Sequence, residues 1–389
     1  MRSAARATLA IVALAACGRP RPSDVTPTFP FPADSLRTQV VAPGVIHHYV
    51  YAASGPWAIH VLQIDLDRCY TARAVKGVVG AIGREKTSDL LGRLNDSVRV
   101  VGGVNADFFS LTQPQGVPVG ALITNGMLVT GPGAQPALVV DSGGALRIAR
   151  LRATGSVAVH GQRIPIDNWN RAAPRGVALF DRAWSGAMDS ASSVVEVAIA
   201  GRHPARVVSV DTTTAGAPIP RDGVVIVAGR NAPERVRAAL LDLHPGDSVD
   251  IAVSLAPLFP RQAVGGRPLL VRDSVIVADV DTTGQPSFST ARHPRTAAGL
   301  ARGGKRLILV VVDGRQKPYS DGMSLRELAK LMLALGARDA LNLDGGGSTT
   351  MVYADPDSGG KLRVANRPSD KGGERAVGDA LAVVRGCGR

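Results

Sequence analysis

Apolar residues follow two different patterns in the last quarter of the chain. Residues 307–312 are a continuous, β-branched apolar run, which is typical of a strand buried on both faces. A helical pattern follows, with apolar residues on one face at Leu325, Leu328, Ala329, Met332 and Leu335. A second apolar run, 340–343, comes after it. The order strand, helix, strand predicts a βαβ unit whose two strands run parallel.

The helix of this unit has clear ends. Ser324 and Glu327 have the spacing of a capping box, in which each side chain bonds the other's backbone amide. Gly336 supplies the glycine that commonly ends a helix. These signals predict a helix from about 325 to 335.

Each apolar run ends in an aspartate followed by glycine. Because parallel strands end on the same side of a sheet, we expect Asp313 and Asp344 at one edge, where open α/β sheets bind ligands. The glycines at 345–347 expose backbone amides that can hold an anion. Such loops also occur as plain turns. Two of them brought together by one helix favour a site.

The rest of the chain is read as mostly strands. Residues 40–66 form short alternating strands, with His60 on an outward face, and a short helix is expected at 87–94. The strand 98–104 ends at Asn105, and Asn125-Gly126 marks a β-hairpin. Short Val-rich segments broken by Gly, Pro and Asp fill 135–285, and a last strand spans 380–384.

These elements predict the α+β class. We expect a mixed sheet with a C-terminal βαβ unit, whose parallel pair is 307–312 and 340–343. The middle region is long and mostly antiparallel. It either wraps the site or forms a separate lobe, and two independent domains are the alternative.

Composition and charge narrow the possible partners. The 389 residues are 45% hydrophobic and 4% aromatic, as in an ordinary globular protein. The formal charge is +13, with 38 arginines and 7 lysines scattered along the chain. Nucleic-acid binding more often shows a basic patch with interleaved aromatics. We therefore expect no nucleic-acid partner, although the charge can attract anionic substrates.

The first residues have the pattern of an export signal. Two arginines precede an apolar stretch that is too short to cross a membrane as a helix. It ends in Leu14-Ala15-Ala16-Cys17, which resembles a bacterial lipobox, so residues 1–16 are predicted to be removed and Cys17 lipidated. A plain secretory signal is the alternative. The stretch 17–38 is expected to be the lipid anchor and a Pro-rich tether that links it to the domain, which places the protein on a membrane of the bacterial cell envelope.

Two further cysteines remain after the anchor. In an oxidising compartment Cys69 and Cys387 could form a disulfide that joins the start of the domain to its end. Two free thiols are the alternative, because a sequence does not give the distance between them.

Several motifs together resemble the phosphodiester glycosidase family. They are RHPRTAAGL, VVVDGR, GMSLRELAKLMLALGARDALNLDGGGSTTM and NRPSDKGGERAVGDAL, with NADFF and AVGGRPLLV upstream. The resemblance extends from about residue 40 onward and implies a domain at 39–387, with a β-rich middle at 135–285 and a motif region at 290–385. Asp107 stands where members commonly carry glycine.

The resemblance implies a hydrolase that cleaves the anomeric C–O bond of a sugar-1-phosphodiester in envelope or extracellular glycans. Such chemistry needs a carboxylate at the anomeric carbon and cations for the departing phosphate. Asp344 is the first choice for the carboxylate, followed by Asp313 and Glu374. The expected substrate and phosphate contacts are Arg295, Arg315, Arg375, Gly345, Gly346, Gly347, Ser348 and Asn105.

No cofactor is expected, and two alternatives stay open. The Asp/Glu cluster could instead bind a divalent cation such as Ca²⁺ or Mg²⁺ in a metal-dependent hydrolase. The chain could also be a non-catalytic envelope lipoprotein that binds glycans or phosphopolymers.

Overall fold

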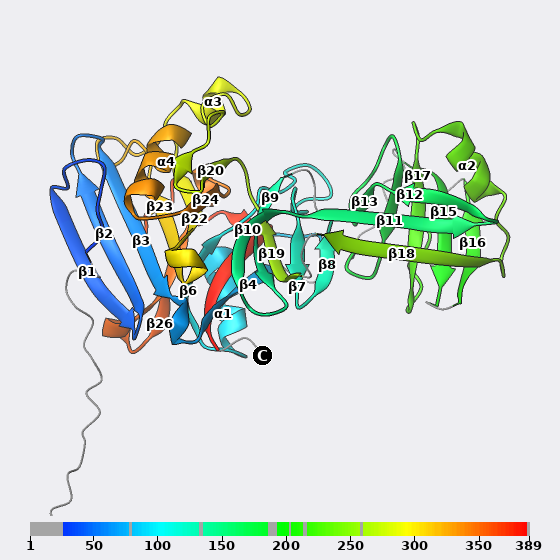
Figure 1. Ribbon diagram of the computed structural model, residues 1–389, viewed down its shortest axis with the longest axis horizontal. Coiled ribbons are helices and arrows are strands. Elements are labelled where there is room, and N and C mark those ends of the chain that lie inside the picture. Colours follow the sequence, from blue (N-terminus) through cyan, green and yellow to red (C-terminus); the bar gives the residue numbers. More distant parts are fainter. Residues whose placement is uncertain are drawn as a thin grey trace, which may run out of the picture.

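The chain forms two lobes joined by a narrow waist (Figure 1). The computed structural model describes residues 26–77, 80–131, 135–185, 193–201, 204–212, 216–256 and 260–386. The larger lobe contains both ends of the described chain, and the smaller lobe is built from the middle of the sequence. Strands dominate both lobes, which confirms the predicted β-rich α+β class.

An eight-stranded sheet forms the centre of the larger lobe. Its spatial order is β1 (Ser35–Ala42), β2 (Val45–Ala52), β3 (Trp57–Asp65), β23 (Arg306–Val312), β22 (Arg295–Ala301), β24 (Asp339–Asn342), β20 (Leu269–Arg272) and β21 (Val275–Ile276). All its paired neighbours run antiparallel.

The predicted βαβ unit is present, but its two strands are not neighbours. Strands β23 and β24 both pair antiparallel with β22, which lies between them. They therefore run in the same direction and end at the same edge, as expected, without a ladder joining them. The sequence motif could not show this, because β22 precedes the unit in the chain and inserts only when the sheet assembles.

Helix α4 (Leu325–Ala334) covers one face of this sheet. Ser324 Oγ accepts from the Glu327 amide at 3.2 Å, and Glu327 Oε2 accepts from the Ser324 amide at 2.8 Å, so the predicted capping box is present. Gly336, with φ of +87°, follows the end of the helix as predicted. The apolar face packs on Ile308, Val310 and Val312.

A second layer of sheets covers the opposite face. One sheet has the order β26 (Lys361–Val364), β25 (Met351–Asp355), β6 (Val100–Asn105), β28 (Asp379–Arg385) and β4 (Tyr70–Lys76). The other has the order β10 (Leu146–Arg150), β9 (Pro136–Asp141), β19 (Pro260–Gly265), β7 (Leu122–Thr124) and β8 (Met127–Thr130). Leu307, Leu309 and Val311 of β23 pack into this layer. Strand β23 is therefore buried on both faces, as its continuous apolar run predicts.

Helix α1 (Thr87–Asn95) lies on the outer side of the sheet that contains β6, where it buries Leu90 and Leu91. This helix agrees with the one expected at 87–94. The hairpin predicted at Asn125-Gly126 is also present, and both residues have positive φ, as a tight hairpin turn requires.

Within the described residues, the smaller lobe is an eight-stranded sheet with one helix. Its order is β12 (Gln162–Ile166), β11 (Arg152–Val159), β18 (Ser248–Ala256), β16 (Ala205–Asp211), β15 (Ser193–Ala200), β17 (Gly223–Gly229), β14 (Val177–Phe180) and β13 (Asn168–Trp169). Strands β13 and β14 form a short parallel pair. The sequence patterns did not predict helix α2 (Glu234–Leu241), which buries Val236 and Leu240 against this lobe.

The start of the described chain packs onto the larger lobe. Phe31 contacts the ring of Trp57 with centroids 4.8 Å apart, and Phe29 stacks on Phe31. Strand β1 begins at Ser35, so part of the expected tether belongs to the fold. The predicted signal segment and Cys17 lie outside the described residues. No helix within the described ranges is long and apolar enough to cross a membrane.

The described residues include Cys69, one of the two cysteines of the expected disulfide. Cys69 is disulfide-bonded, and its carbonyl accepts from the amide of Gly386 at 2.8 Å. Cys387 lies outside the described residues, so its pairing with Cys69 stays a prediction.

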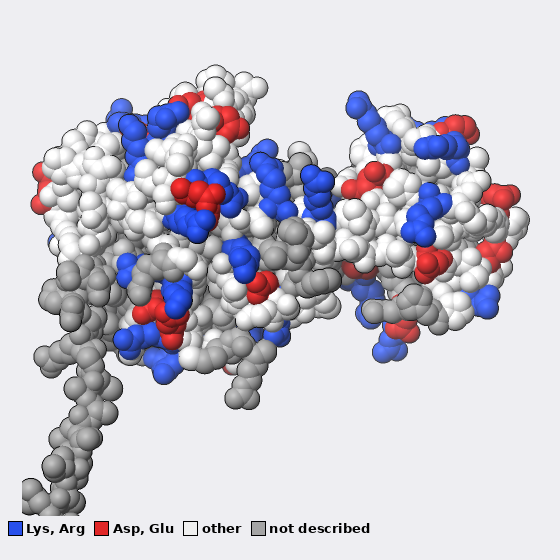
Figure 2. All heavy atoms as spheres, in the orientation of Figure 1, with Lys and Arg blue, Asp and Glu red and all other residues white. Residues whose placement is uncertain are grey.

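Charged side chains show no basic stripe on the face seen in Figure 2. Lysine and arginine are spread over both lobes there and are interspersed with acidic residues. This distribution agrees with the scatter of arginine along the sequence.

Candidate active site

The candidate site lies at the edge of the central sheet where β24 ends. The backbone of Asp344 is held between two sheets: its amide donates to the Ala106 carbonyl at 2.8 Å, and its carbonyl accepts from Asn105 Nδ2 at 2.6 Å. Both partners lie at the end of β6. The edge of the central sheet and the second layer therefore meet at Asp344.

The Asp344 carboxyl group is largely withdrawn from water. Burial raises its pKa to about 6, and the Ser348 hydroxyl, the Gly345 amide and the charges of Arg375 and Arg267 oppose part of that rise. The Gly345 amide donates to Asp344 Oδ1 at 2.9 Å. A carboxyl group with such a pKa changes its protonation near neutral pH, which is a common property of catalytic acids and bases.

Arg315 lies over the glycine loop on one side. Gly346 has a φ of +63°, and a Cβ atom there would lie 3.2 Å from Arg315 Nη1. Only glycine combines this backbone conformation with so close an approach. Arg315 Nη2 is also 3.2 Å from His293 Nδ1. The guanidinium is exposed and stands next to the loop that carries Asp344.

Arg375 lies against the next glycine. A Cβ atom at Gly347 would come within 2.3 Å of Arg375 Nη2 and 2.2 Å of Asp370 Oδ1. Arg375 and Asp370 form a two-bond ion pair at 2.9 and 3.1 Å. Two guanidinium groups therefore flank the Asp344 loop. Each lies so close to a glycine that a larger residue in place of that glycine would have to displace the guanidinium group.

The loop amides are less available than expected. Gly345 donates to Asp344, and the Gly346 amide donates to the Pro294 carbonyl at 2.9 Å. Both bonds stabilise the loop itself. Arginine side chains, rather than these two amides, are thus the groups placed to bind an anion.

Several residues that were not singled out from the sequence lie around the Asp344 loop and its arginines. The guanidinium of Arg267 lies 5.0 Å from the ring centroid of Phe108, and its charge lowers the pKa of Asp344. Phe108 in turn meets the ring of Phe288 edge-on at 5.9 Å. Arg267, Phe108 and His293 all occur in motifs quoted above, which was the available signal.

Asp313 ends its strand at the same sheet edge but does not join the Asp344 carboxyl group. Its side chain is 1% exposed. Its carboxylate accepts from the Tyr319 hydroxyl and from Asn366 Nδ2, both at 2.9 Å, and from the Arg367 amide at 3.1 Å. Burial raises its pKa, and these hydrogen bonds oppose the rise. Asp313 therefore holds two loops together.

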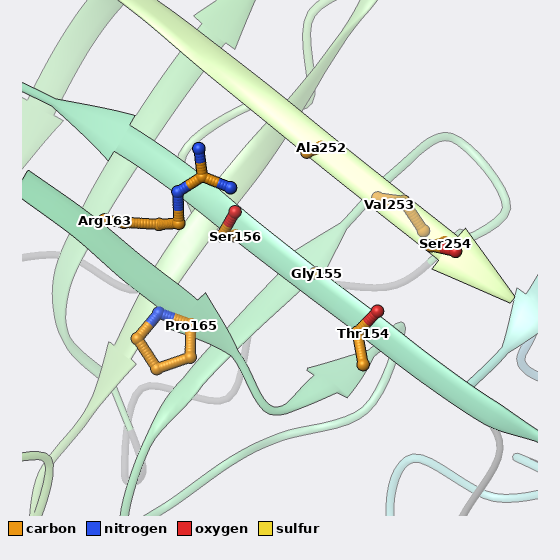
Figure 3. Close-up of a pocket in the computed structure, with 8 residues that line it drawn as sticks. All are labelled: Thr154, Gly155, Ser156, Arg163, Pro165, Ala252, Val253 and Ser254. Atoms are coloured by element: carbon orange, nitrogen blue, oxygen red, sulfur yellow. The ribbon is translucent and has the colours of Figure 1, made fainter. Parts of the chain in front are cut away.

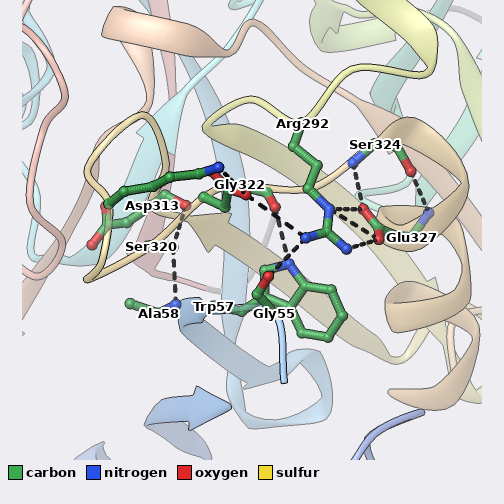
Figure 4. A network of polar contacts seen from close by, with 11 residues as sticks. Gly55, Trp57, Ala58, Arg292, Asp313, Ser320, Gly322, Ser324 and Glu327 are labelled. Atoms are coloured by element: carbon green, nitrogen blue, oxygen red, sulfur yellow. Dashed lines mark hydrogen bonds and ion pairs between the residues drawn. The ribbon is translucent and has the colours of Figure 1, made fainter. Parts of the chain in front are cut away.

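A polar network fixes the loop that carries Arg315 (Figure 4). Ser320 Oγ donates to the Asp313 carbonyl at 2.6 Å and accepts from the Ala58 amide at 3.1 Å. Trp57 Nε1 donates to the Gly322 carbonyl at 2.9 Å. The loop is thus tied to the start of β3 at several points.

Arg292 extends this network to helix α4. It donates to both carboxylate oxygens of Glu327 and, through Nη1, to the Gly55 carbonyl at 2.7 Å. The capping residue of α4 therefore also anchors the segment that precedes β22.

Three other predicted site residues act as braces. Glu374 Oε2 accepts from the amide of Ser88 at 3.0 Å, at the start of α1. Arg295 is 2% exposed, and it donates to the backbone carbonyls of Met323, Phe288 and Ala291. Asn105 Oδ1 accepts from Thr296 Oγ1 at 2.8 Å and from the Thr350 amide at 3.0 Å, besides its bond to Asp344.

A buried acidic pair lies behind Asp344. Asp379 Oδ1 accepts from the Asp107 amide at 2.8 Å, and Asp107 Oδ2 accepts from Gly120 at 2.5 Å. Burial raises the pKa of Asp379 to about 7 although the charge of Lys76 opposes it. Burial also raises the pKa of Asp107 well above its usual value. Sequence patterns had not drawn attention to Asp379, because it directly precedes the apolar run of the last strand.

The acidic residues do not assemble into a metal site in the part of the chain that the structure describes. No group of three or more His, Cys, Asp or Glu residues is arranged there to hold a metal ion. Asp313 and Glu374 are engaged with separate partners, so the ligand set considered from the sequence is not brought together.

Known proteins are similar to this chain at the level of both sequence and fold. Residues 193–384, about half of the chain, match the profile of the phosphodiester glycosidase family. This match confirms the resemblance seen in the motifs, and the matched stretch contains Arg267, Arg315, Asp344 and Arg375. None of the curated proteins matches the chain.

Two bacterial structures share the fold. A hypothetical protein from Synechocystis has a TM-score of 0.73 and 25% sequence identity, and the match covers 91% of this chain. The chain spans 64% of that protein's length. A protein from Burkholderia pseudomallei, provisionally described as exported, has a TM-score of 0.72 and 22% identity and covers 92% of this chain and 98% of its own.

A third structure is the catalytic domain of zebrafish N-acetylglucosamine-1-phosphodiester alpha-N-acetylglucosaminidase, auto-inhibited by its pro-peptide. It has a TM-score of 0.42 and 17% identity, and the match covers 90% of this chain and 88% of that one.

Proposed function

We propose that this chain, whose residues 193–384 match the phosphodiester glycosidase family, hydrolyses the anomeric C–O bond of a sugar-1-phosphodiester in envelope or extracellular glycans. The observation that carries the proposal is the Asp344 loop. It holds a carboxyl group with a pKa of about 6, and the guanidinium groups of Arg315 and Arg375 rest on two glycines of the same loop.

Asp344 supplies the carboxylate that the sugar requires. As the glycosidic bond breaks, the anomeric carbon gains positive charge, and a carboxylate stabilises it, either as nucleophile or as the base for a water molecule. The ionised form performs this role, so activity is expected to rise as the pH increases through about 6.

The arginines act on the other side of the bond. The leaving group is a phosphate monoester, whose second pKa lies near 6, so it departs with little help from an acid. Its growing negative charge needs stabilisation, and the planar guanidinium group suits phosphate oxygens. Arg315 is exposed beside Gly346 and is placed for this contact, with Arg375 on the neighbouring glycine.

The test is the release of reducing sugar from a panel of sugar-1-phosphodiesters. We expect turnover by the wild type, loss of turnover in Asp344→Asn, and a kcat/KM that falls below a pH of about 6. Asp250→Asn, an exposed aspartate on β18, is the matched control and should retain full activity. Near-wild-type turnover by a folded Asp344→Asn protein would refute the assignment.

We also propose that the protein is exported and anchored by a lipid on Cys17. The support is the lipobox-like sequence at 14–17, and one structural neighbour is provisionally described as exported. Mass spectrometry of membrane-extracted protein should find a lipidated N-terminal Cys17. An unmodified N-terminus at any other residue would contradict this.

A further inference from the structure

A polar cavity lies beside the loop that carries both Arg315 and Tyr319. It has a volume of about 590 Å³, and its lining comes from β1, β2, β3, β25, β26 and the two loops that Asp313 joins. Tyr319, Asn366 and Arg367 line it, and all three donate to the Asp313 carboxylate. Asp313 therefore supports this cavity rather than the Asp344 loop.

A continuous stack of planar groups forms one wall of the cavity. His47 stacks on Tyr353 with centroids 4.6 Å apart, and on His60 at 5.3 Å. His60 in turn contacts Tyr49 at 5.0 Å, and the guanidinium of Arg363 lies 5.7 Å from the Tyr353 ring. His60 was expected on an outward face of its strand. It is only 5% exposed, because the second layer of sheets covers that face.

The imidazole rings of this wall stay uncharged at neutral pH. Burial lowers the pKa of His47 to about 4 and that of His60 to about 3, and His47 Nε2 lies 3.1 Å from His60 Nδ1. Burial also raises the pKa of Tyr319. Neutral imidazole and phenol groups can both donate and accept hydrogen bonds. They therefore match sugar hydroxyls, which do the same.

Positive charge surrounds this neutral wall. Three arginines and one aspartate line the cavity: Arg37, Arg363, Arg367 and Asp357. All three arginines are exposed. Arg363 is bonded to Asp355 at 2.9 Å, whereas Arg367 lies 5.5 Å from the ring centroid of Tyr319. The net charge of the lining favours an anionic ligand.

A cavity in the smaller lobe offers a contrast (Figure 3). It has a volume of about 510 Å³ between β11, β12 and β18, with Arg163 as its one charged lining residue. Its other lining residues are small, aliphatic or hydroxyl-bearing, and none is aromatic. The combination of stacked rings and several arginines distinguishes the cavity beneath Arg37 and Arg367.

We propose that this cavity is a binding site for a phosphorylated sugar unit, distinct from the Asp344 loop. The tyrosine and histidine groups contact the sugar, and Arg37 and Arg367 contact the phosphate. Such a site lets the protein hold a phosphate-bearing glycan at a second point. The inference does not depend on turnover at Asp344, since it concerns binding alone.

The experiment is calorimetric titration of the full chain with glucose 6-phosphate, glucose and inorganic phosphate. The sugar phosphate should bind more tightly than either part. The Arg37→Ala/Arg367→Ala double variant should bind it at least about tenfold more weakly, as expected when charge-assisted contacts are lost. Tyr49→Phe keeps the stack and should weaken binding of both glucose and glucose 6-phosphate. Arg163→Ala is the matched control and should bind like the wild type.

The same titration in Asp344→Asn separates the two sites. Binding that survives Asp344→Asn and is weakened by the arginine double variant supports the proposal. Binding that is lost in Asp344→Asn but unchanged in the double variant overturns it and places the ligand at the Asp344 loop. Absence of binding by glucose 6-phosphate, or equal affinity for inorganic phosphate alone, also overturns the proposal of a sugar site.

Discussion

Replacing Asp344 by asparagine should stabilise the folded protein at the same time as it abolishes activity. The carboxyl group is held in a site that disfavours its charge: burial raises its pKa from 3.8 to about 6. Asparagine has nearly the same shape and keeps an oxygen that can accept the Gly345 amide. The substitution therefore removes mainly the cost of a buried charge.

The magnitude follows from proton linkage. Because the pKa of Asp344 is higher in the folded state, its contribution to stability is fully present below a pH of about 3.8. That contribution is lost as the pH rises through about 6. Each unit of difference between the folded and unfolded pKa is worth about 1.4 kcal/mol. Ionising Asp344 therefore costs the folded state about 3 kcal/mol at pH 8. At pH 5 the cost is about half as large. Asp344→Asn should recover these amounts, and the gain should vanish below a pH of about 4.

Urea denaturation at pH 4, 5 and 8 measures this difference, with tryptophan fluorescence as the probe. Trp57 of β3 reports on the larger lobe and Trp169 of β13 on the smaller one, whereas Trp184 packs in a core cluster that also contains residues of the larger lobe. Asp250→Asn controls for the loss of one surface charge. Asp107 and Asp379 titrate in both proteins, so most of their effect cancels in the comparison.

Two results would refute the reasoning. Equal stabilisation at all three pH values would show that the effect does not come from the proton on Asp344. Unchanged stability at pH 8 would show that the carboxylate is not desolvated in the folded protein, and the physical basis for its role at the anomeric carbon would be lost.

The remaining predictions concern the arginine, a brace and the disulfide. Arg315→Ala should lower kcat/KM more for a sugar-1-phosphodiester than for an accepted aryl glycoside of the same sugar. For the diester, the activation barrier should rise by roughly 3 kcal/mol. Equal losses on both substrates would show that Arg315 does not stabilise the leaving group. Glu374→Ala removes the acceptor for the Ser88 amide, so it should cost about 1 kcal/mol of stability and leave kcat nearly unchanged. A large loss of kcat at unchanged stability would instead make Glu374 a catalytic residue. Pairing of Cys69 with Cys387 should contribute about 5 kcal/mol in a chain-entropy estimate, and an unchanged thermal midpoint after reduction would count against it.

Local signals in the sequence predicted the βαβ region accurately. The capping box at Ser324, the glycine at 336 and the strand at 307–312 all depend on residues close together in the chain. Such features follow from backbone geometry and short-range hydrogen bonds, so they can be read before the fold is known. The shared edge of Asp313 and Asp344 was predicted for the same reason.

The roles of individual polar residues were harder to predict. Asp313, Arg295, Glu374 and Asn105 have the chemistry of site residues and lie in the quoted motifs. The structure uses all four to hold loops or a helix end, through partners up to 286 positions away in the chain. A motif records which residues occur together, but it does not distinguish a group that binds substrate from one that positions the loop.

The sequence by itself determined the strands and helix of the βαβ region, the glycine loop after β24 and the family resemblance, because these depend on local patterns. Only the tertiary structure decided that β22 separates β23 from β24 and that Arg315 and Arg375 approach Gly346 and Gly347. It also decided that Asp313 bonds to residues lining a separate cavity. It also decided the burial that raises the pKa of Asp344. Burial and long-range contacts arise when distant segments pack, and the free energy of a charge depends on that packing.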